Sequence, residues 1–452
     1  MQRLFRKISH KWRSVAAALG VGLAVFLAIA AVGKLPQWLS MGTSENPSPV
    51  QTTPMTPSPS PSPTATNDAP EIDPQLVDAN NRFGWRLFSQ IRTASPQENI
   101  FISPTSITTA LQMTLEGAKG QTQQAIAQTL ALPNLPTETR REAMAALAEF
   151  LSDPAPEIQL DIANALWVAS TNSSSPAVNP SFVETVRNIY QAEVGELNFS
   201  TPEAIATINN WVAENTNGKI EKITRELPAN TVAFLANAIY FKGLWAYPFD
   251  PENTENRDFY LANGETISHP FISQNDTFPY YENDRFQAVS LPYGTSGKPQ
   301  DFSLYVFLPK SNISLSDFYQ QQTPENWQNW MQEFRPLSGS IALPKLQVEY
   351  EISLTEILAN MGMEIAFDPA NANFTEIRDR EPKVFLDRIQ HKTFLEVNEE
   401  GTEAAGATSV RVGTTSVAVD TFEMEVNRPF FLTIRDNRSG TILFMGTITN
   451  PS

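Results

Sequence analysis

The ten residues from Glu399 to Thr408, with the sequence EEGTEAAGAT, constrain the fold of this 452-residue chain more than any other segment. The run is too apolar for a typical surface loop and too poor in large side chains for a core strand. It continues through residues 409–415, which are again small or β-branched apart from Arg411. A segment of this composition fits few places in a fold, and we consider two of them, a flexible loop and a β-strand.

Alternation along the segment tests the strand interpretation, because successive side chains of a strand point to opposite faces. One set is uncharged and consists of small or β-branched residues, namely Thr402, Ala404, Gly406, Thr408, Val410, Val412 and Thr414. The other set holds both charges and consists of Glu403, Ala405, Ala407, Ser409, Arg411, Gly413 and Thr415. The alternation predicts a strand with one buried and one solvated face, whereas composition alone favours a flexible loop.

Known protein families offer a close match to this segment. It resembles the hinge of the reactive-centre loop in inhibitory serpins, and the matching residues are Glu399, Glu400, Gly401, Thr402, Glu403, Ala404, Ala405, Gly406, Ala407 and Thr408. Six further segments resemble serpin signatures and stand in the family's order, namely Asn99–Ile107, Leu115–Thr122, Asn237–Trp245, His391–Lys392, Asn427–Phe430 and Leu443–Gly446. The resemblance covers the chain from about Ile72 to Ser452.

The resemblance implies a fold and an activity. The fold is α+β, with a large central β-sheet, two further sheets, about eight or nine helices and an exposed reactive-centre loop. The activity is inhibition of serine proteases as a suicide substrate. The protease attacks the loop and forms an acyl-enzyme, and the freed loop then inserts into the central sheet as a new strand. About thirteen residues at about 3.3 Å each would carry the attached protease roughly 45 Å.

The resemblance also implies roles for individual residues. Ser103, Ser106, Asn237 and His391 correspond to the sheet-opening (shutter) region, and Trp245 corresponds to the breach, where the loop enters the sheet. The cleaved bond follows the hinge glycine by about fourteen residues in the family, which places it between Thr415 and Ser416. Counting back about fourteen residues from Pro429 also gives Thr415, while shorter family loops would place the bond nearer Ala418.

Catalytic motifs are missing from the sequence, and we expect no enzyme, no cofactor and no metal. The chain has three histidines, His10, His269 and His391, and no cysteine, which excludes a thiol protease. It contains no G-x-S-x-G, H-E-x-x-H, P-loop or C-x-x-C motif. A hydrolase with a pair of carboxylates stays open, although nothing among the 49 acidic residues marks such a pair.

The N-terminal residues predict export of the chain. Residues 1–14 form a basic cytoplasmic flank, and residues 15–33 form an apolar signal peptide or membrane anchor with Ala28-Ile29-Ala30 as a candidate cleavage site. Residues 34–71 form a linker rich in Pro, Ser and Thr, and residues 72–452 form the serpin domain. The domain would be extracellular or periplasmic, either secreted or anchored in the membrane through residues 15–33.

Charge and loop sequence restrict the partners. The net charge is −17, and without the six basic residues of residues 1–34 it is −23, which argues against nucleic acid as a partner. Thr415 suits a shallow apolar pocket and therefore elastase-like or subtilisin-like serine proteases. Arg411 is a rival site for a trypsin-like enzyme. Only Arg140 and Arg141 form a basic pair after Gln121, which argues against activation by a polyanion. We expect a monomer before complex formation.

Two other interpretations remain. Some serpins bind hormones or assist protein folding without inhibiting a protease, but their hinges usually contain bulky, charged or proline residues, which this hinge lacks apart from its glutamates. The Pro/Ser/Thr linker would also suit a structural or adhesive domain attached to a cell wall. That domain would show no change on proteolysis.

Periodicity predicts several elements outside the hinge. Leu76, Phe83, Leu87 and Ile91 follow a helical stripe, as do Ile107, Leu111 and Leu115 behind Pro104. The run 302–308 predicts a buried strand, and the segments 430–434 and 441–448 around Asp436–Gly440 predict a hairpin.

Overall fold

Helices surround two β-sheets in the computed structural model, which describes residues 72–132, 135–152, 156–170, 176–298, 300–402 and 421–452. Counting α9, the π-helical turn η2 and α10 as one interrupted helix, these residues form nine helices and one 3₁₀ turn, η1. The bounds are α1 (Pro74–Ala94), α2 (Pro104–Gly117), α3 (Gly120–Thr129), α4 (Thr137–Ser152), α5 (Pro180–Tyr190), α6 (Pro202–Asn215), η1 (Pro251–Asn253), α7 (Leu315–Gln320), α8 (Pro324–Glu333), α9 (Thr355–Leu358), η2 (Ala359–Met363) and α10 (Glu364–Phe367). The predicted α+β class is confirmed.

The two predicted helical stripes are confirmed by α1 and α2, and both helices begin as their sequences indicate. Asp73 Oδ1 accepts a hydrogen bond from the Gln75 amide at 2.8 Å, and Pro74 follows in the first turn. Ser103 Oγ accepts from the Ser106 amide at 3.3 Å, again with a proline in the first turn. Such caps satisfy amide groups that have no partner within the helix. Ser103 is therefore fixed at the start of α2.

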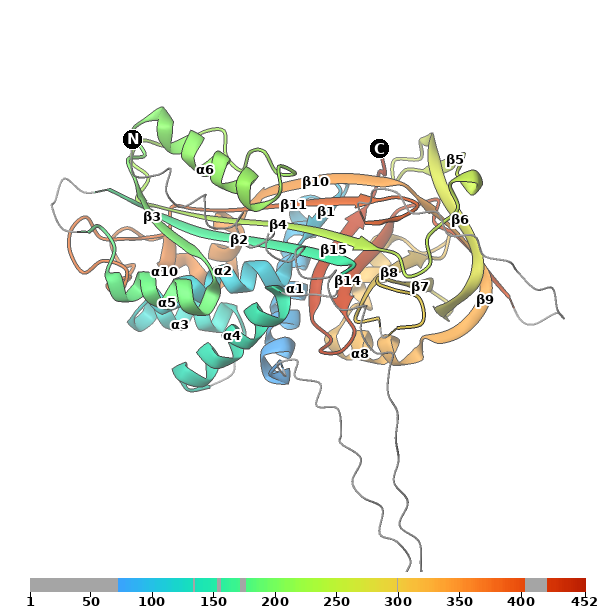
Figure 1. Ribbon diagram of the computed structural model, residues 1–452, viewed down its shortest axis with the longest axis horizontal. Coiled ribbons are helices and arrows are strands. Elements are labelled where there is room, and N and C mark those ends of the chain that lie inside the picture. Colours follow the sequence, from blue (N-terminus) through green and yellow to red (C-terminus); the bar gives the residue numbers. More distant parts are fainter. Residues whose placement is uncertain (1–71, 133–134, 153–155, 171–175, 299, 403–420) are drawn as a thin grey trace, which may run out of the picture. The chain divides into compact units, whose positions relative to one another are not determined.

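The central sheet has the strand order β10-β11-β4-β2-β3, with the short strand β12 paired to the end of β4. Its strands are β2 (Ile158–Ala169), β3 (Glu193–Leu197), β4 (Ala233–Leu244), β10 (Leu346–Ser353), β11 (Arg388–Val397) and β12 (Gly401–Thr402). β4 is antiparallel to β2 and to β12, and it is parallel to β11. The predicted large central sheet is thus present (Figure 1), and Gly401 and Thr402 of the segment predicted as a hinge pair with the end of β4 as β12.

A second sheet contains nine strands in the order β1-β15-β14-β8-β7-β6-β9-β13, with β5 paired to β6. The strands are β1 (Ile100–Ile102), β5 (Glu255–Tyr260), β6 (Thr266–Glu282), β7 (Phe286–Pro292), β8 (Phe302–Pro309), β9 (Arg335–Pro344), β13 (Phe422–Glu425), β14 (Phe430–Asp436) and β15 (Ile442–Ile448). β8 and the hairpin of β14 and β15 confirm the strands predicted there. The two further sheets expected from the resemblance are joined into one, because the long strand β6 pairs with β5 at its start, with β9 from Phe271 to Tyr280 and with β7 at its end.

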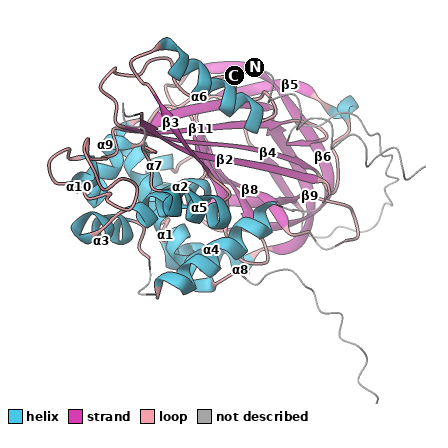
Figure 2. Cartoon of the chain, turned by 60° about the vertical axis from the view of Figure 1, so that its left-hand side comes forward, coloured by secondary structure: helices cyan, strands magenta, loops and turns pink. Residues whose placement is uncertain are grey.

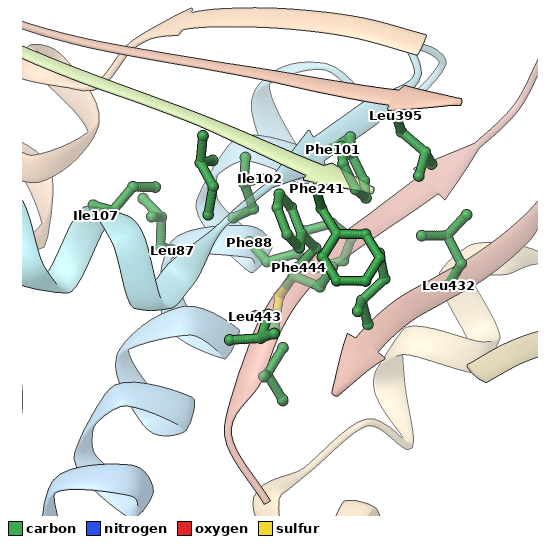
Figure 3. Close-up of a cluster of buried hydrophobic side chains, with 14 of the residues drawn as sticks. Leu87, Phe88, Phe101, Ile102, Ile107, Phe241, Leu395, Leu432, Leu443 and Phe444 are labelled. Carbon is green, nitrogen blue, oxygen red and sulfur yellow. The ribbon is translucent and has the colours of Figure 1, made fainter. Parts of the chain in front are cut away.

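The main hydrophobic core lies against one face of the central sheet, where α1, α2 and the second sheet meet it (Figure 3). Phe101 stacks on Phe444 with ring centroids 5.0 Å apart, and Phe241 of β4 contacts the same ring edge-on at 5.9 Å. A separate cluster on the opposite face packs α6 against β2 and β4 (Figure 2). Odd-numbered residues of β4 such as Phe241 therefore face the main core, and even-numbered ones such as Tyr240 face the α6 side.

Candidate functional site

The candidate site is the seam between β4 and β11. The two strands pair from Arg388 opposite Phe234 as far as Phe394 opposite Tyr240. Beyond that point β12 takes over the edge of β4, with Thr402 opposite Gly243 and Gly401 opposite Leu244. The first residues of the predicted hinge thus already form a strand at one end of the seam, in the orientation that a longer inserted strand would need.

Thr402 lies on the core face of the sheet. Its side chain is fully buried, and its hydroxyl is 2.7 Å from the hydroxyl of Tyr293. The ring of Tyr293 stacks on Trp245 with centroids 4.6 Å apart, and burial raises the pKa of Tyr293. Position 402 therefore accepts a small polar side chain that bonds to one neutral hydroxyl in apolar surroundings.

Gly401 makes a close backbone approach that explains its identity. A Cβ atom built on Gly401 would lie 2.1 Å from the carbonyl oxygen of Gly243 and 2.9 Å from Cα of Leu244. Side chains do not tolerate contacts this short, so the chain can enter the sheet here only with glycine.

Trp245 lies where the hinge enters the sheet. Its backbone amide donates to the carbonyl of Glu400 at 2.9 Å, and its indole Nε1 donates to the carbonyl of Asn398, also at 2.9 Å. The amide of Phe249 donates to the carbonyl of Glu399 at 2.8 Å. The segment from Asn398 to Glu400 is therefore held to the end of β4 by both backbone and side-chain bonds.

Glu399 adds an ion pair that the sequence did not reveal. Lys345 Nζ lies 2.9 Å from Glu399 Oε2, and the hydroxyl of Thr254 donates to Glu399 Oε1 at 2.8 Å. Burial by itself would raise the pKa of Glu399, but the bonds from Lys345 and Thr254 hold that pKa below its usual value. Both partners are more than fifty residues away in the chain, and no local pattern marks them.

A polar row crosses the central sheet below β12. Asn164 of β2, Asn237 of β4 and His391 of β11 are register partners in neighbouring strands. Asn237 Nδ2 donates to Asn164 Oδ1 at 2.5 Å and to Ser106 Oγ at 2.6 Å. The structure thus brings Ser103, Ser106, Asn237 and His391 together, as the resemblance implied, and adds Asn164. The sequence signal for Asn164 was a single asparagine among the otherwise apolar residues 162–169.

The row fixes the protonation of His391. Its Nε2 accepts a hydrogen bond from the Ser103 amide at 3.2 Å, so that nitrogen carries no proton, and Nδ1–H donates to Asn237 Oδ1 at 2.5 Å. Burial lowers the pKa of His391 to about 3. Because a backbone amide occupies Nε2 and the ring is fully buried, this imidazole cannot act as a base on a substrate.

Protonation of His391 gives a pH-dependent prediction. The unfolded chain takes up this proton near pH 6.5, while the folded chain resists it down to about pH 3. The contribution of neutral His391 to stability is therefore complete above pH 6.5 and is lost as the pH falls, by up to about 1.4 kcal/mol per pH unit. Urea unfolding at pH 7.5 and 5.0 should show a steeper loss for the wild-type domain than for His391→Gln. Parallel losses would show that His391 is not the group responsible.

Arg140 and Arg141 are not free to bind a polyanion. Arg140 Nη2 lies 2.9 Å from Glu116 Oε1, and Arg141 Nη2 lies 2.7 Å from Glu116 Oε2. Burial by itself would raise the pKa of Glu116, but the hydrogen bonds from the two arginines hold it below its usual value. Arg141 Nη1 also lies 2.8 Å from Glu138 Oε1, so Glu116 and Glu138 together offset the charges of the two guanidinium groups.

The remaining predicted site residues lie outside the described part of the chain. They are Glu403, Ala404, Ala405, Gly406, Ala407, Thr408, Thr415 and Ser416. Residues 1–71, with the predicted export segment and linker, lie outside it as well. Within the described ranges, no helix combines the length and apolar character needed to cross a membrane, and no three acidic or histidine side chains are grouped to hold a metal ion.

Comparison with known proteins places this geometry in context. The family model described as serpin (serine protease inhibitor) matches residues 78–451. Antithrombin-III of Mus musculus is 32% identical over 391 residues, which cover 83% of this chain and 82% of the relative. The solved structure of the thermophilic serpin tengpin in its native state superposes with a TM-score of 0.76 and 27% identity over 84% of this chain and 95% of that one. The solved structure of human thyroxine-binding globulin complexed with its hormone superposes with a TM-score of 0.76 and 26% identity, over 84% of this chain and 99% of that one.

Proposed function

The chain belongs to the serpin family, and from that premise we propose that it inhibits serine proteases as a suicide substrate. The family is one of protease inhibitors rather than enzymes, with inhibitory members such as antithrombin, and it also contains non-inhibitory members such as thyroxine-binding globulin. In the proposed mechanism a protease attacks the bond between Thr415 and Ser416 and becomes acylated by Thr415. The released loop then inserts between β4 and β11 and carries the protease with it before the ester can be hydrolysed.

One observation carries this proposal. Gly401 and Thr402 already pair with β4 as the antiparallel strand β12, at the place where β11 leaves that edge. Insertion can therefore proceed by extending an existing strand. The next residues whose side chains would face the core in such a strand are Ala404, Gly406 and Thr408. They are small enough to follow Thr402 into the sheet without displacing core side chains.

The test is formation of a covalent complex. The domain comprising residues 72–452 is mixed with a panel of serine proteases and boiled in detergent. We expect a band at the summed mass of the two proteins, because the acyl-enzyme ester survives denaturation. Complete turnover of the loop by every protease, with no such band, would contradict inhibition.

Specificity gives a second prediction. Thr415 is small and uncharged, so we expect stable complexes with elastase-like or subtilisin-like proteases and only weak complex formation with trypsin-like ones. Sequencing the peptide released from the complex should give a new N-terminus at Ser416. A new N-terminus at Val412 would instead identify Arg411 as the residue attacked. Thr415→Arg is the matched variant and should shift the preference toward trypsin-like proteases.

A ligand-binding serpin is the alternative, and the structural likeness to thyroxine-binding globulin favours considering it. Such a protein would need no rapid insertion, and its hinge could carry bulky residues. The small residues of this hinge favour inhibition. A binding protein would be cleaved by the whole protease panel without trapping any member.

We also propose that the domain acts outside the cytoplasm. Residues 1–14 are basic, residues 15–33 are apolar, and residues 34–71 are rich in Pro, Ser and Thr. This order suits an exported domain that is either secreted or held at a distance from a membrane by residues 34–71. Fractionation of cells that express the full chain, with N-terminal sequencing of the product, distinguishes cleavage from anchoring.

A further inference from the structure

We infer that Asp387 is a positioning residue that opposes the last step of strand insertion by holding the far end of the β4–β11 seam closed. Asp387 immediately precedes β11. Its Oδ2 accepts hydrogen bonds from the amides of Val232 and Ala233, at 2.5 and 3.1 Å, and its own amide donates to the carbonyl of Ala233 at 3.2 Å. This inference rests on the proposed function, since it concerns the route of the inserting strand.

The position of this contact follows from the pairing of the sheet. On the β2 side, the amide of the even-numbered residue Leu244 donates to the carbonyl of Glu157, and the carbonyl of the even-numbered residue Val232 accepts from the amide of Ala169. The odd-numbered residue Trp245 bonds on the other side of the strand, where its amide donates to the carbonyl of Glu400, next to β12. Odd-numbered residues of β4 therefore direct their amide and carbonyl groups toward the seam.

Ala233 is the first of these odd-numbered residues. β11 has no further paired residue to accept its amide, because the ladder ends with Arg388 opposite Phe234. The Asp387 carboxylate takes that place. Asp387 thus satisfies both backbone groups that Ala233 presents to the seam.

The register of β12 shows what an inserted strand would require. Thr402 lies opposite Gly243, so a strand that continued without a bulge would place Val412 opposite Ala233. Ala233 lies twelve positions before Trp245, an even number, so Val412 and Ala233 would form a hydrogen-bonded pair as Glu400 and Trp245 do. Val412 would need both backbone groups that Asp387 now holds. The proposed acyl attachment at Thr415 lies three residues further along. Complete insertion therefore requires the hydrogen bonds between Asp387 and Ala233 to break.

The energetic consequence is specific to one state of the protein. With the seam closed, the carboxylate receives two amide donors, and charge-assisted bonds of this kind are stronger than neutral ones. Burial raises the pKa of Asp387, and the two amide donors offset this rise only in part. After full insertion Val412 would take the Ala233 amide. The inserted strand would also move β11 away from β4 by one strand spacing, about 4.8 Å, and so carry the Asp387 carboxylate out of reach of the Val232 amide. Asp387 therefore stabilises the form with the loop outside the sheet and does not stabilise the inserted form.

Thermal melts of four proteins, each intact and cleaved in the reactive loop, test this inference. For Asp387→Ala we expect the midpoint of the intact form to fall by about 3 to 5 °C and that of the cleaved form to stay within about 1 °C of wild type. Asp387→Asn keeps one acceptor and should show a smaller fall, also confined to the intact form. It provides the same comparison if the alanine variant does not fold.

Asp161→Ala is the matched control. Asp161 of β2 also has a pKa raised by burial, and its Oδ2 accepts side-chain bonds from Gln159 at 2.8 Å and Asn217 at 2.6 Å. These bonds lie away from the seam, so this variant should lower both midpoints equally. Equal falls in both forms of the Asp387 variants would overturn the role of Asp387 while leaving inhibition intact. A wild-type protein with the same midpoint before and after cleavage would overturn the proposed function and this inference with it.

Discussion

Cleavage near Thr415 is expected to raise the melting temperature of the domain by tens of degrees. The freed segment 403–415 would become a strand of the central sheet, with backbone hydrogen bonds to β4 on one side and β11 on the other. About thirteen residues gaining such bonds, at roughly 1 kcal/mol each, exceed the effect of any single substitution several-fold. Cutting an ordinary surface loop is neutral or destabilising, because it only increases the freedom of the chain.

Thermal melts of intact and loop-cleaved protein measure this effect. A matched control is the same protein cut within residues 34–71, where we expect no change in midpoint. Both cuts break the chain, so a rise in the melting temperature that follows only the loop cut would be due to insertion. Equal midpoints for the intact and loop-cleaved forms would rule out insertion into the sheet.

The hinge shows how far sequence reasoning reaches. Alternation assigned Thr402 to an uncharged face, and the side chain is buried against Tyr293 in the structure. Alternation is a local property of a strand and can be read from neighbouring residues. The partner could not be predicted, because Tyr293 is 109 residues away and only folding brings it there.

The same limit applies across the central sheet. Resemblance identified His391 and Asn237, but Asn164 was missed, since a single asparagine in an apolar run has many structural explanations. Asp387 was missed as well, because its importance lies in the place where the β11 ladder ends, and strand ends are the least predictable features of a sequence. Sequence thus indicated which residues line the seam, and the pairing register was needed to show how they hold it.

Thr402→Arg is expected to turn the inhibitor into a substrate. In the structure position 402 lies opposite Gly243 and against Tyr293, in apolar surroundings that offer a neutral hydroxyl and no room for a guanidinium. Burying an unpaired charge there would cost several kcal/mol. The arginine would therefore keep β12 out of the sheet and slow insertion. Recognition at Thr415, thirteen residues away, would be unaffected.

Glu403→Arg is the matched control, because it introduces the same side chain one residue further along. In the register of β12, position 403 would lie opposite Lys242, which is even-numbered and therefore on the face away from the main core. An arginine there stays in water and, in the inserted strand, replaces an attraction between Glu403 and Lys242 by a repulsion, each worth about 1 kcal/mol or less at an exposed site. The ratio of covalent complex to cleaved product, at fixed protease, should collapse for Thr402→Arg and stay near wild type for Glu403→Arg. If both variants lost the complex equally, length or charge at the hinge would be responsible and the strand register proposed for insertion would be wrong.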